Sequence, residues 1–169
     1  VWGTLDAPLI DVSAGNRMAG ADLFSIDVNG RSSHGGEPHL GMDAISIGCA
    51  IVNNLQQCVS RMNDPLHPEV LTIGEFAGGP QFNVISDHVW MQGTTRYFTR
   101  TPQIEGQMRR IIEQTAASFG ADATLNYEYK SPAVVNSDSL MNRVAHDTVV
   151  KLFGNEALGN LPPMMGGED

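Results

Sequence analysis

Two histidines and a glutamate lie close together in a glycine-rich segment near the amino-terminal end of the sequence. His34, Glu37 and His39 fall within RSSHGGEPHLGM, residues 31–42. Imidazole can bind a metal ion or donate a hydrogen bond to a substrate near neutral pH, so either chemistry suits this cluster. Loop histidines are also commonly exposed to solvent or bonded to nearby carbonyl groups. The spacing alone therefore leaves both interpretations open.

Further candidates occur in the middle of the chain. Arg96 lies in QGTTRYF, inside a predicted strand, where its guanidinium either binds a carboxylate or is an exposed partner of a neighbouring strand. Asn83 lies in GGPQFNVI, where its amide either satisfies the loop backbone or contacts a ligand. Arg100, just beyond the strand, is interpreted as an ordinary surface residue.

The sequence ends in MMGGED, residues 164–169. Glycines such as Gly166 and Gly167 let a backbone approach a ligand closely, and Glu168 can accept hydrogen bonds from one. The same residues also fit an exposed acidic end. The sequence contains no nucleophile elbow, phosphate-binding loop, His-Glu-x-x-His motif or dinucleotide fingerprint. It therefore shows no self-contained catalytic apparatus.

The spacing of apolar side chains predicts the strands that position these residues. Residues 22–30 and 122–130 alternate between apolar and polar side chains, which is typical of half-buried strands. Residues 70–76 and 88–98 are rich in β-formers and are separated by a Gly-Gly-Pro loop. They are predicted to form an antiparallel pair.

Two helices are predicted between these strands. Asp43 is the expected N-cap of a helix that extends to Met62. A second helix is expected to begin at Pro102 and to end at Gly120. The predicted apolar stripe of this second helix consists of Ile104, Met108, Ile111, Thr115 and Phe119.

These elements follow one another as β-α-β-β-α-β over residues 21–131. That order predicts an α/β (α+β) fold of the ferredoxin-like type, with two helices on one face of a four-stranded antiparallel sheet. Residues 1–20 have little periodicity, and residues 132–169 contain a third predicted helix, residues 137–153. Both ends are therefore expected to belong to another domain.

The composition excludes several classes of protein. The 19 acidic and 10 basic residues give a formal charge of -9, which repels nucleic acid and anionic lipid. No apolar run is long enough to span a membrane. Cys49 and Cys58 lie on one predicted helix, too far apart for a disulfide, so reduced thiols and a cytoplasmic location are expected.

Four segments resemble successive motifs of one enzyme family. They are MAGADLFSIDVNGRSSHGGEPHLGMDAI, VLTIGEFAGGPQFNVISD, QGTTRYF and MMGGED. The family is that of the metal-dependent amidohydrolases of the aminoacylase and carboxypeptidase type, which includes hippurate hydrolase and the auxin-conjugate hydrolases. Such enzymes hold two zinc, manganese or cobalt ions in a catalytic domain that is interrupted by a small dimerisation, or lid, domain.

The resemblance implies a division of the chain into three parts. Residues 1–20 would leave the catalytic domain, residues 21–131 would form the lid domain, and residues 132–169 would return as a truncated segment. The metal ligands and the general-base glutamate would lie outside this chain, so it is expected to hold no metal and to be inactive alone. The complete enzyme is expected to be a homodimer that hydrolyses N-acyl amino acids or small peptides.

The resemblance also implies roles for individual residues. His34 matches a lid histidine that reaches the partner subunit's active site and stabilises the oxyanion. Asn83 and Arg96 match residues that hold the carboxylate of the substrate. The residues that match a loop lining the same pocket are Gly166, Gly167 and Glu168. The segment after His34, Gly-Gly-Glu, departs from the small apolar residues of most relatives, which leaves the substrate preference open.

Two other functions compete with this interpretation. The isolated chain could be a non-catalytic dimerisation or binding module, which predicts a stable dimer without metal or hydrolysis. The β-α-β-β-α-β order also occurs in RNA-binding platforms, but the negative charge and the absence of an aromatic-rich strand motif argue against that function.

Overall fold

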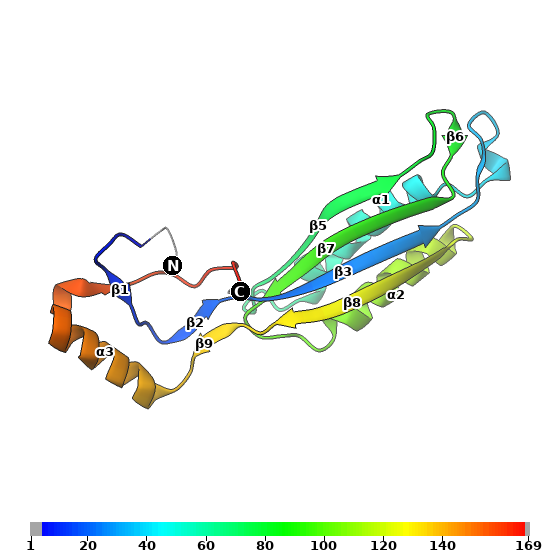
Figure 1. Ribbon diagram of the computed structural model, residues 1–169. Helices are drawn as coiled ribbons and strands as arrows, with labels where there is room; N and C mark the ends of the chain where they lie inside the picture. The colour runs from blue at the N-terminus through cyan, green and yellow to red at the C-terminus, as the bar shows by residue number, and fades with distance from the viewer. Residues whose placement is uncertain (1–4, 168–169) are drawn as a thin grey trace.

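Four antiparallel strands form the central sheet of the structure, a computed structural model that describes residues 5–167 (Figure 1). They are β3 (Gly20–Asn29), β5 (Glu69–Gly78), β7 (His88–Tyr97) and β8 (Asp122–Ser131). Their order across the sheet is β5-β7-β3-β8. Each strand lies where the sequence predicts one, and β5 and β7 form the predicted antiparallel pair.

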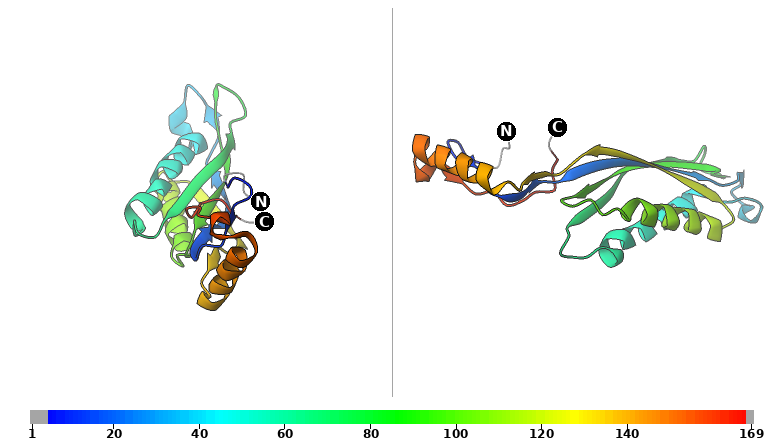
Figure 2. Two further views of the ribbon diagram at one scale, coloured as in Figure 1. Left: turned by 90° about the vertical axis from the view of Figure 1, so that its left-hand side faces the viewer. Right: turned by 90° about the horizontal axis from the view of Figure 1, so that it is seen from below.

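Two helices cover one face of this sheet and leave the other face, here called the open face, uncovered (Figure 2). They are α1 (Ala44–Gln57) and α2 (Ile104–Ser118). Asp43 caps α1 as predicted, because its side chain accepts a hydrogen bond from the N–H of Ile45 at 3.0 Å. The predicted continuation of α1 is instead a π-helical turn, Cys58–Met62.

The hydrophobic core lies between the sheet and these helices. Phe24, Ile26 and Val28 of β3 are completely or almost completely buried and point toward the helix layer. Their polar neighbours in the sequence face the other side, as the alternation in the sequence predicts. The mixed α/β arrangement is thus built on one apolar face of the sheet and one apolar stripe of each helix.

The second helix, α2, differs from its prediction in two respects. It begins at Ile104, two residues after the predicted Pro102. In its second half the buried residues are Ile112 and Ala116, whereas Ile111 and Thr115 were predicted. The shift by one position arises because the core-facing stripe continues in steps of four residues. Phe119 is the C-cap and is exposed, so its predicted place in the core is wrong.

A narrow two-stranded neck joins this sheet domain to the remaining segments (Figure 1). In the neck, β2 (Gly15–Met18) pairs antiparallel with β9 (Val134–Asn136). Beyond it, β1 (Ile10–Asp11) pairs in parallel with β10 (Leu158–Gly159). The third predicted helix is α3 (Ser139–Phe153), which begins two residues later than predicted because the preceding aspartate caps it.

Arg17 ties the two ends of the described chain together beyond the neck. Its Nη2 donates to Asp11 Oδ2 at 2.5 Å and to the carbonyl oxygen of Leu161 at 2.6 Å. A 3₁₀ turn, Asn155–Ala157, leads from α3 into β10. Segments far apart in the sequence therefore form one small unit on the far side of the neck from the sheet.

The two cysteines are free thiols, as their predicted spacing requires. Cys49 is exposed on α1, and Cys58 is buried in the π-helical turn. Among the described residues, no helix combines the length and apolar character needed to cross a membrane.

Candidate functional site

A cavity lies at the end of the open face that adjoins the neck, and we call it the base cavity. Its volume is about 570 Å³. It is lined by residues of β3, β7 and β8 and of the carboxyl-terminal segment, including Arg96, Lys130, Ser131, Gly166 and Gly167. The structure therefore brings three of the predicted site residues together, namely Arg96, Gly166 and Gly167.

Arg96 faces the base cavity because of the alternation of β7. Its neighbours Thr95 and Tyr97 are buried on the helix side, which leaves Arg96 on the open face. No ion pair joins Arg96 to any residue between 5 and 167. A Cβ atom at Gly167 would lie 3.0 Å from Arg96 Nη1. The glycine therefore leaves room for the guanidinium.

Backbone pairing holds the carboxyl-terminal segment next to Arg96. The N–H of Ala19 donates to the carbonyl oxygens of Met164 and Gly166, at 3.1 and 3.0 Å. Met18 forms a parallel bridge with Met164 at the same place. The position of the two glycines is thus set by the end of the neck. Glu168, predicted to belong to the same loop, lies outside the described residues.

The other two predicted residues meet at the opposite end of the sheet, which we call the tip. There β4 (Ser33–His34) pairs antiparallel with β6 (Val84–Ile85). The N–H of Gly35 donates to the carbonyl oxygen of Asn83 at 2.8 Å, and a Cβ atom at Gly35 would lie 2.8 Å from that oxygen. Only glycine fits this approach. The loop predicted to be irregular also contains a 3₁₀ turn, Pro38–Leu40.

The imidazole of His34 is oriented by the backbone two residues later. Its Nδ1 accepts a hydrogen bond from the N–H of Gly36 at 3.1 Å. A ring nitrogen that accepts a hydrogen bond carries no proton, so the neutral ring carries its proton on Nε2. The side chain is exposed. The geometry therefore presents Nε2–H as a hydrogen-bond donor at the surface of the tip.

The cluster of His34, Glu37 and His39 does not form a metal site. Within residues 5–167, no three His, Cys, Asp or Glu side chains are arranged to hold a metal ion. Of the two chemistries left open for the loop histidines, the described geometry supports hydrogen-bond donation by His34.

The tip and the base cavity lie at opposite ends of β7 (Figure 1). From His88 to Arg96 the strand advances eight residues, which at about 3.3 Å per residue is roughly 26 Å. His88 pairs with Asn29, and the tip lies beyond that pair. Within one chain, His34 and Asn83 therefore cannot contact the same small molecule as Arg96.

A buried carboxylate that the sequence reasoning missed lies behind the base cavity. Asp22 is 1% exposed and accepts hydrogen bonds from Tyr97 Oη (3.1 Å), Tyr127 Oη (3.2 Å), Arg100 Nη2 (2.9 Å) and the N–H of Lys130 (3.1 Å). The interpretation of Arg100 as ordinary surface is therefore wrong, because it pairs with a buried charge. The signal in the sequence was an aspartate in the core-facing register of a strand.

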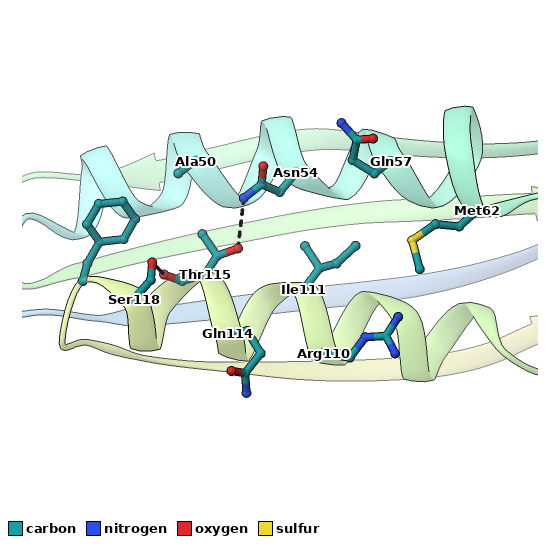
Figure 3. Close-up of a pocket in the computed structure, with 10 residues that line it drawn as sticks. Ala50, Asn54, Gln57, Met62, Arg110, Ile111, Gln114, Thr115 and Ser118 are labelled. Atoms are coloured by element: carbon teal, nitrogen blue, oxygen red, sulfur yellow. Dashed lines mark hydrogen bonds between the residues drawn. The ribbon is translucent and has the colours of Figure 1, made fainter.

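A more apolar groove of about 650 Å³ lies in the helix layer, between α1 and α2 (Figure 3). Ala50 and Asn54 of α1 face Ile111 and Thr115 of α2 across it, and Asn54 Nδ2 donates to Thr115 Oγ1 at 3.1 Å. None of the predicted site residues that the structure describes lines this groove, and the sheet separates it from the base cavity. The candidate site is therefore the tip and the base cavity.

Comparison with known proteins shows what the chain is similar to. It is 37% identical to an N-acyl-L-amino acid amidohydrolase of Geobacillus stearothermophilus, over 82% of this chain and 38% of that protein. It is 35% identical to an IAA-amino acid hydrolase of Arabidopsis thaliana, over 92% of this chain and 36% of that protein. The chain thus spans about two fifths of the length of these curated relatives.

A solved structure shows the same architecture. The crystal structure of a Bacillus subtilis dinuclear metal binding peptidase of the M20 family superimposes with a TM-score of 0.68 and 26% identity, over 93% of this chain and 38% of that chain. Residues 18–119 match the family model described as the M20 peptidase dimerisation domain. This match covers most of the sheet and both of its helices. The chain therefore belongs to the family of M20 peptidase dimerisation domains.

Proposed function

We propose that this chain is the dimerisation and substrate-contacting part of a longer metal-dependent hydrolase that cleaves the amide bond of N-acyl amino acids or small peptides. The observation that carries the proposal is the base cavity, where Arg96 faces Gly167 and has no ion pair within the described residues. A guanidinium binds a carboxylate through two parallel hydrogen bonds, and these substrates carry a free carboxylate. The names of the two hydrolase relatives support the same chemistry.

We further propose that residues 21–131 form a ferredoxin-like domain and that residues 1–20 and 132–169 belong to a separate catalytic domain. The order of the elements and the strand order β5-β7-β3-β8 support the first part. The narrow neck supports the second, because the chain passes between the two regions through the paired strands β2 and β9. The two free thiols support a cytoplasmic location.

The separation of the tip from the base cavity supports a site shared between two subunits. In a two-fold dimer, the tip of one subunit can reach the base cavity of the other. His34 Nε2–H then donates to the oxyanion that forms when the substrate carbonyl is attacked. Asn83 accompanies His34, because its carbonyl is bonded to Gly35. The Asn83 amide and Arg96 would therefore hold the substrate carboxylate from different subunits.

We propose that the homodimer forms through the edge of β5. The sheet has two edges, β5 and β8. Ile45 and Phe76 beside the β5 edge are 37% and 39% exposed, whereas the β8 edge carries the ion pair between Glu128 and Lys130. Charged side chains protect an edge from pairing, and exposed apolar side chains favour it.

We propose a metal centre only for the longer protein. A relative in the same family is described as binding a dinuclear metal centre. The residues of this chain between 5 and 167 do not offer a fitting set of donors, so we derive no step of the reaction through a metal. Two zinc, manganese or cobalt ions would be bound by residues outside that range.

Mixing two inactive variants of the longer protein tests the shared site. His34→Ala and Arg96→Met should each lower kcat/KM for an N-acyl amino acid by about a hundredfold. A mixed dimer keeps one intact site of two, so re-equilibrating equal amounts should restore roughly a quarter of the wild-type activity. No recovery on mixing would contradict the shared site.

The alternative function is that of a non-catalytic dimerisation or binding module. Two measurements on the wild-type longer protein distinguish this alternative from the proposed enzyme. A wild-type longer protein that forms a stable dimer but hydrolyses no N-acyl amino acid or small peptide would support the module and would contradict the proposed enzyme. Light scattering and a substrate panel provide the two measurements.

A further inference from the structure

We propose that Lys130 binds a second carboxylate on the amino-acid half of the substrate, so that the enzyme favours N-acyl amino acids with an acidic side chain. This inference rests on the proposed function, because it assigns the first carboxylate to Arg96. It goes beyond that function by naming the substrate class. The residues that carry it belong to one chain and do not depend on the arrangement of the dimer.

A β-bulge fixes the backbone of Lys130 beside the base cavity. In the pairing of β3 with β8, Ala21 lies opposite Ser131 and Asp22 lies opposite Tyr129, which leaves Lys130 as an extra residue. The N–H of Lys130 donates to the buried carboxylate of Asp22 at 3.1 Å. The bulge is therefore stabilised by a buried carboxylate, and the backbone position of Lys130 does not depend on its own side chain.

The ammonium group of Lys130 lies on the same face of the sheet as Arg96. Its Nζ contacts Glu128 Oε1 at 2.5 Å, and Glu128 is paired with Leu23, a residue of the open face. Lys130 and Arg96 both line the base cavity. Arg96 and Ser131 lie on one rung of the sheet, two strands apart, so their backbones are about 10 Å apart. Lys130 directly precedes Ser131, so the long side chains of Arg96 and Lys130 can close most of that distance around one dicarboxylate.

The ion pair with Glu128 does not prevent this role. The side chains of Lys130 and Glu128 are 44% and 58% exposed. An ion pair that is this exposed is weak and is screened by water and salt. A substrate carboxylate inside the cavity, held in place by the bond of the first carboxylate to Arg96, can therefore replace Glu128 as the partner of Lys130.

The test compares two substrates of the same shape in the longer protein, N-acetyl-glutamate and N-acetyl-glutamine. The wild-type ratio of their kcat/KM values should favour the glutamate by about tenfold or more. Lys130→Met should bring the ratio close to one by slowing the glutamate substrate alone. The substitution to methionine keeps the backbone N–H that donates to Asp22. Thermal unfolding of the variant and the wild type checks that the fold is unchanged. Lys151→Met on the exposed surface of α3 is the matched control and should leave the ratio unchanged.

The possible results separate this inference from the proposed function. Hydrolysis of both substrates with a ratio that Lys130→Met does not change would overturn the role of Lys130 and leave the proposed function standing. An equal loss on both substrates in Lys130→Met would also overturn it. Hydrolysis of neither of these substrates nor of any other N-acyl amino acid by the wild type would overturn the proposed function itself.

Discussion

At the scale of single residues, Glu69 is a carboxylate held in the core beneath the π-helical turn. It is 8% exposed, and its Oε1 has no hydrogen-bond partner among residues 5–167. Burial raises the pKa of Glu69 above its usual value. Burial and the nearby Glu69 charge also raise the pKa of Cys58 to about 11. This corner of the core therefore favours the neutral form of both side chains.

Glu69 should make the stability of the protein depend on pH in a defined direction. Because its pKa is raised by folding, the folded state loses stability as the pH rises from about 4.3 through the folded pKa. Glu69→Gln should therefore raise the free energy of unfolding by about 1 kcal/mol at pH 7 and by much less at pH 4. Urea unfolding at the two pH values measures this, with Glu75→Gln on the exposed part of β5 as the control. A gain independent of pH would contradict the argument.

At the scale of elements, the regular alternation of apolar and polar residues made the strands predictable. The places where that alternation is interrupted could not be predicted. The positions of Phe24, Ile26 and Val28 follow directly from a period of two. The same alternation places Asp22 in the core, but its partners come from β7, β8 and Arg100, and no local pattern reveals such distant contacts. The bulge in β8 was unpredictable for the same reason, since it depends on pairing with β3.

The hydrogen bonds of Asp22 should contribute more to stability than those of an exposed aspartate on the same strand. Asp22→Ala leaves two tyrosines, an arginine and a backbone N–H without their acceptor. The expected loss is about 2 kcal/mol, below the usual value for a buried pair because Arg100 is partly exposed. Asp27→Ala, which removes only an exposed contact with His88, should cost less than about 0.5 kcal/mol. Equal losses in urea unfolding would refute the structural role of Asp22.

At the scale of the whole molecule, the candidate site residues are divided between the two ends of the sheet. The resemblance predicts the site residues, and it assigns Asn83 and Arg96 to the same carboxylate. Within one chain the structure places Asn83 beside His34, because the strands β4 and β6 pair at the tip. Local sequence does not encode this division, because it depends on the length of the strands and on the strand order.

The proposed dimer can be tested with two matched substitutions. Thr72 on β5 and Thr124 on β8 are both exposed threonines on edge strands. If two copies pair through β5, Thr72→Lys should weaken the dimer several-fold, because pairing would bring the new charges close together. Thr124→Lys should leave it unchanged. Light scattering over a range of concentrations gives the dissociation constant, and the opposite pattern would assign the interface to β8.

The neck has a consequence for how such a protein can change over evolutionary time. Ala21 near the start of β3 and Ser131 at the end of β8 are paired neighbours, so the chain enters and leaves the sheet at adjacent positions. A segment whose ends lie side by side can be deleted and the gap closed by a short turn, or inserted into a host without stretching it. The sheet could thus be deleted or exchanged without stretching its host, and because it carries His34 and Arg96, such an exchange would also change how the proposed substrate is held.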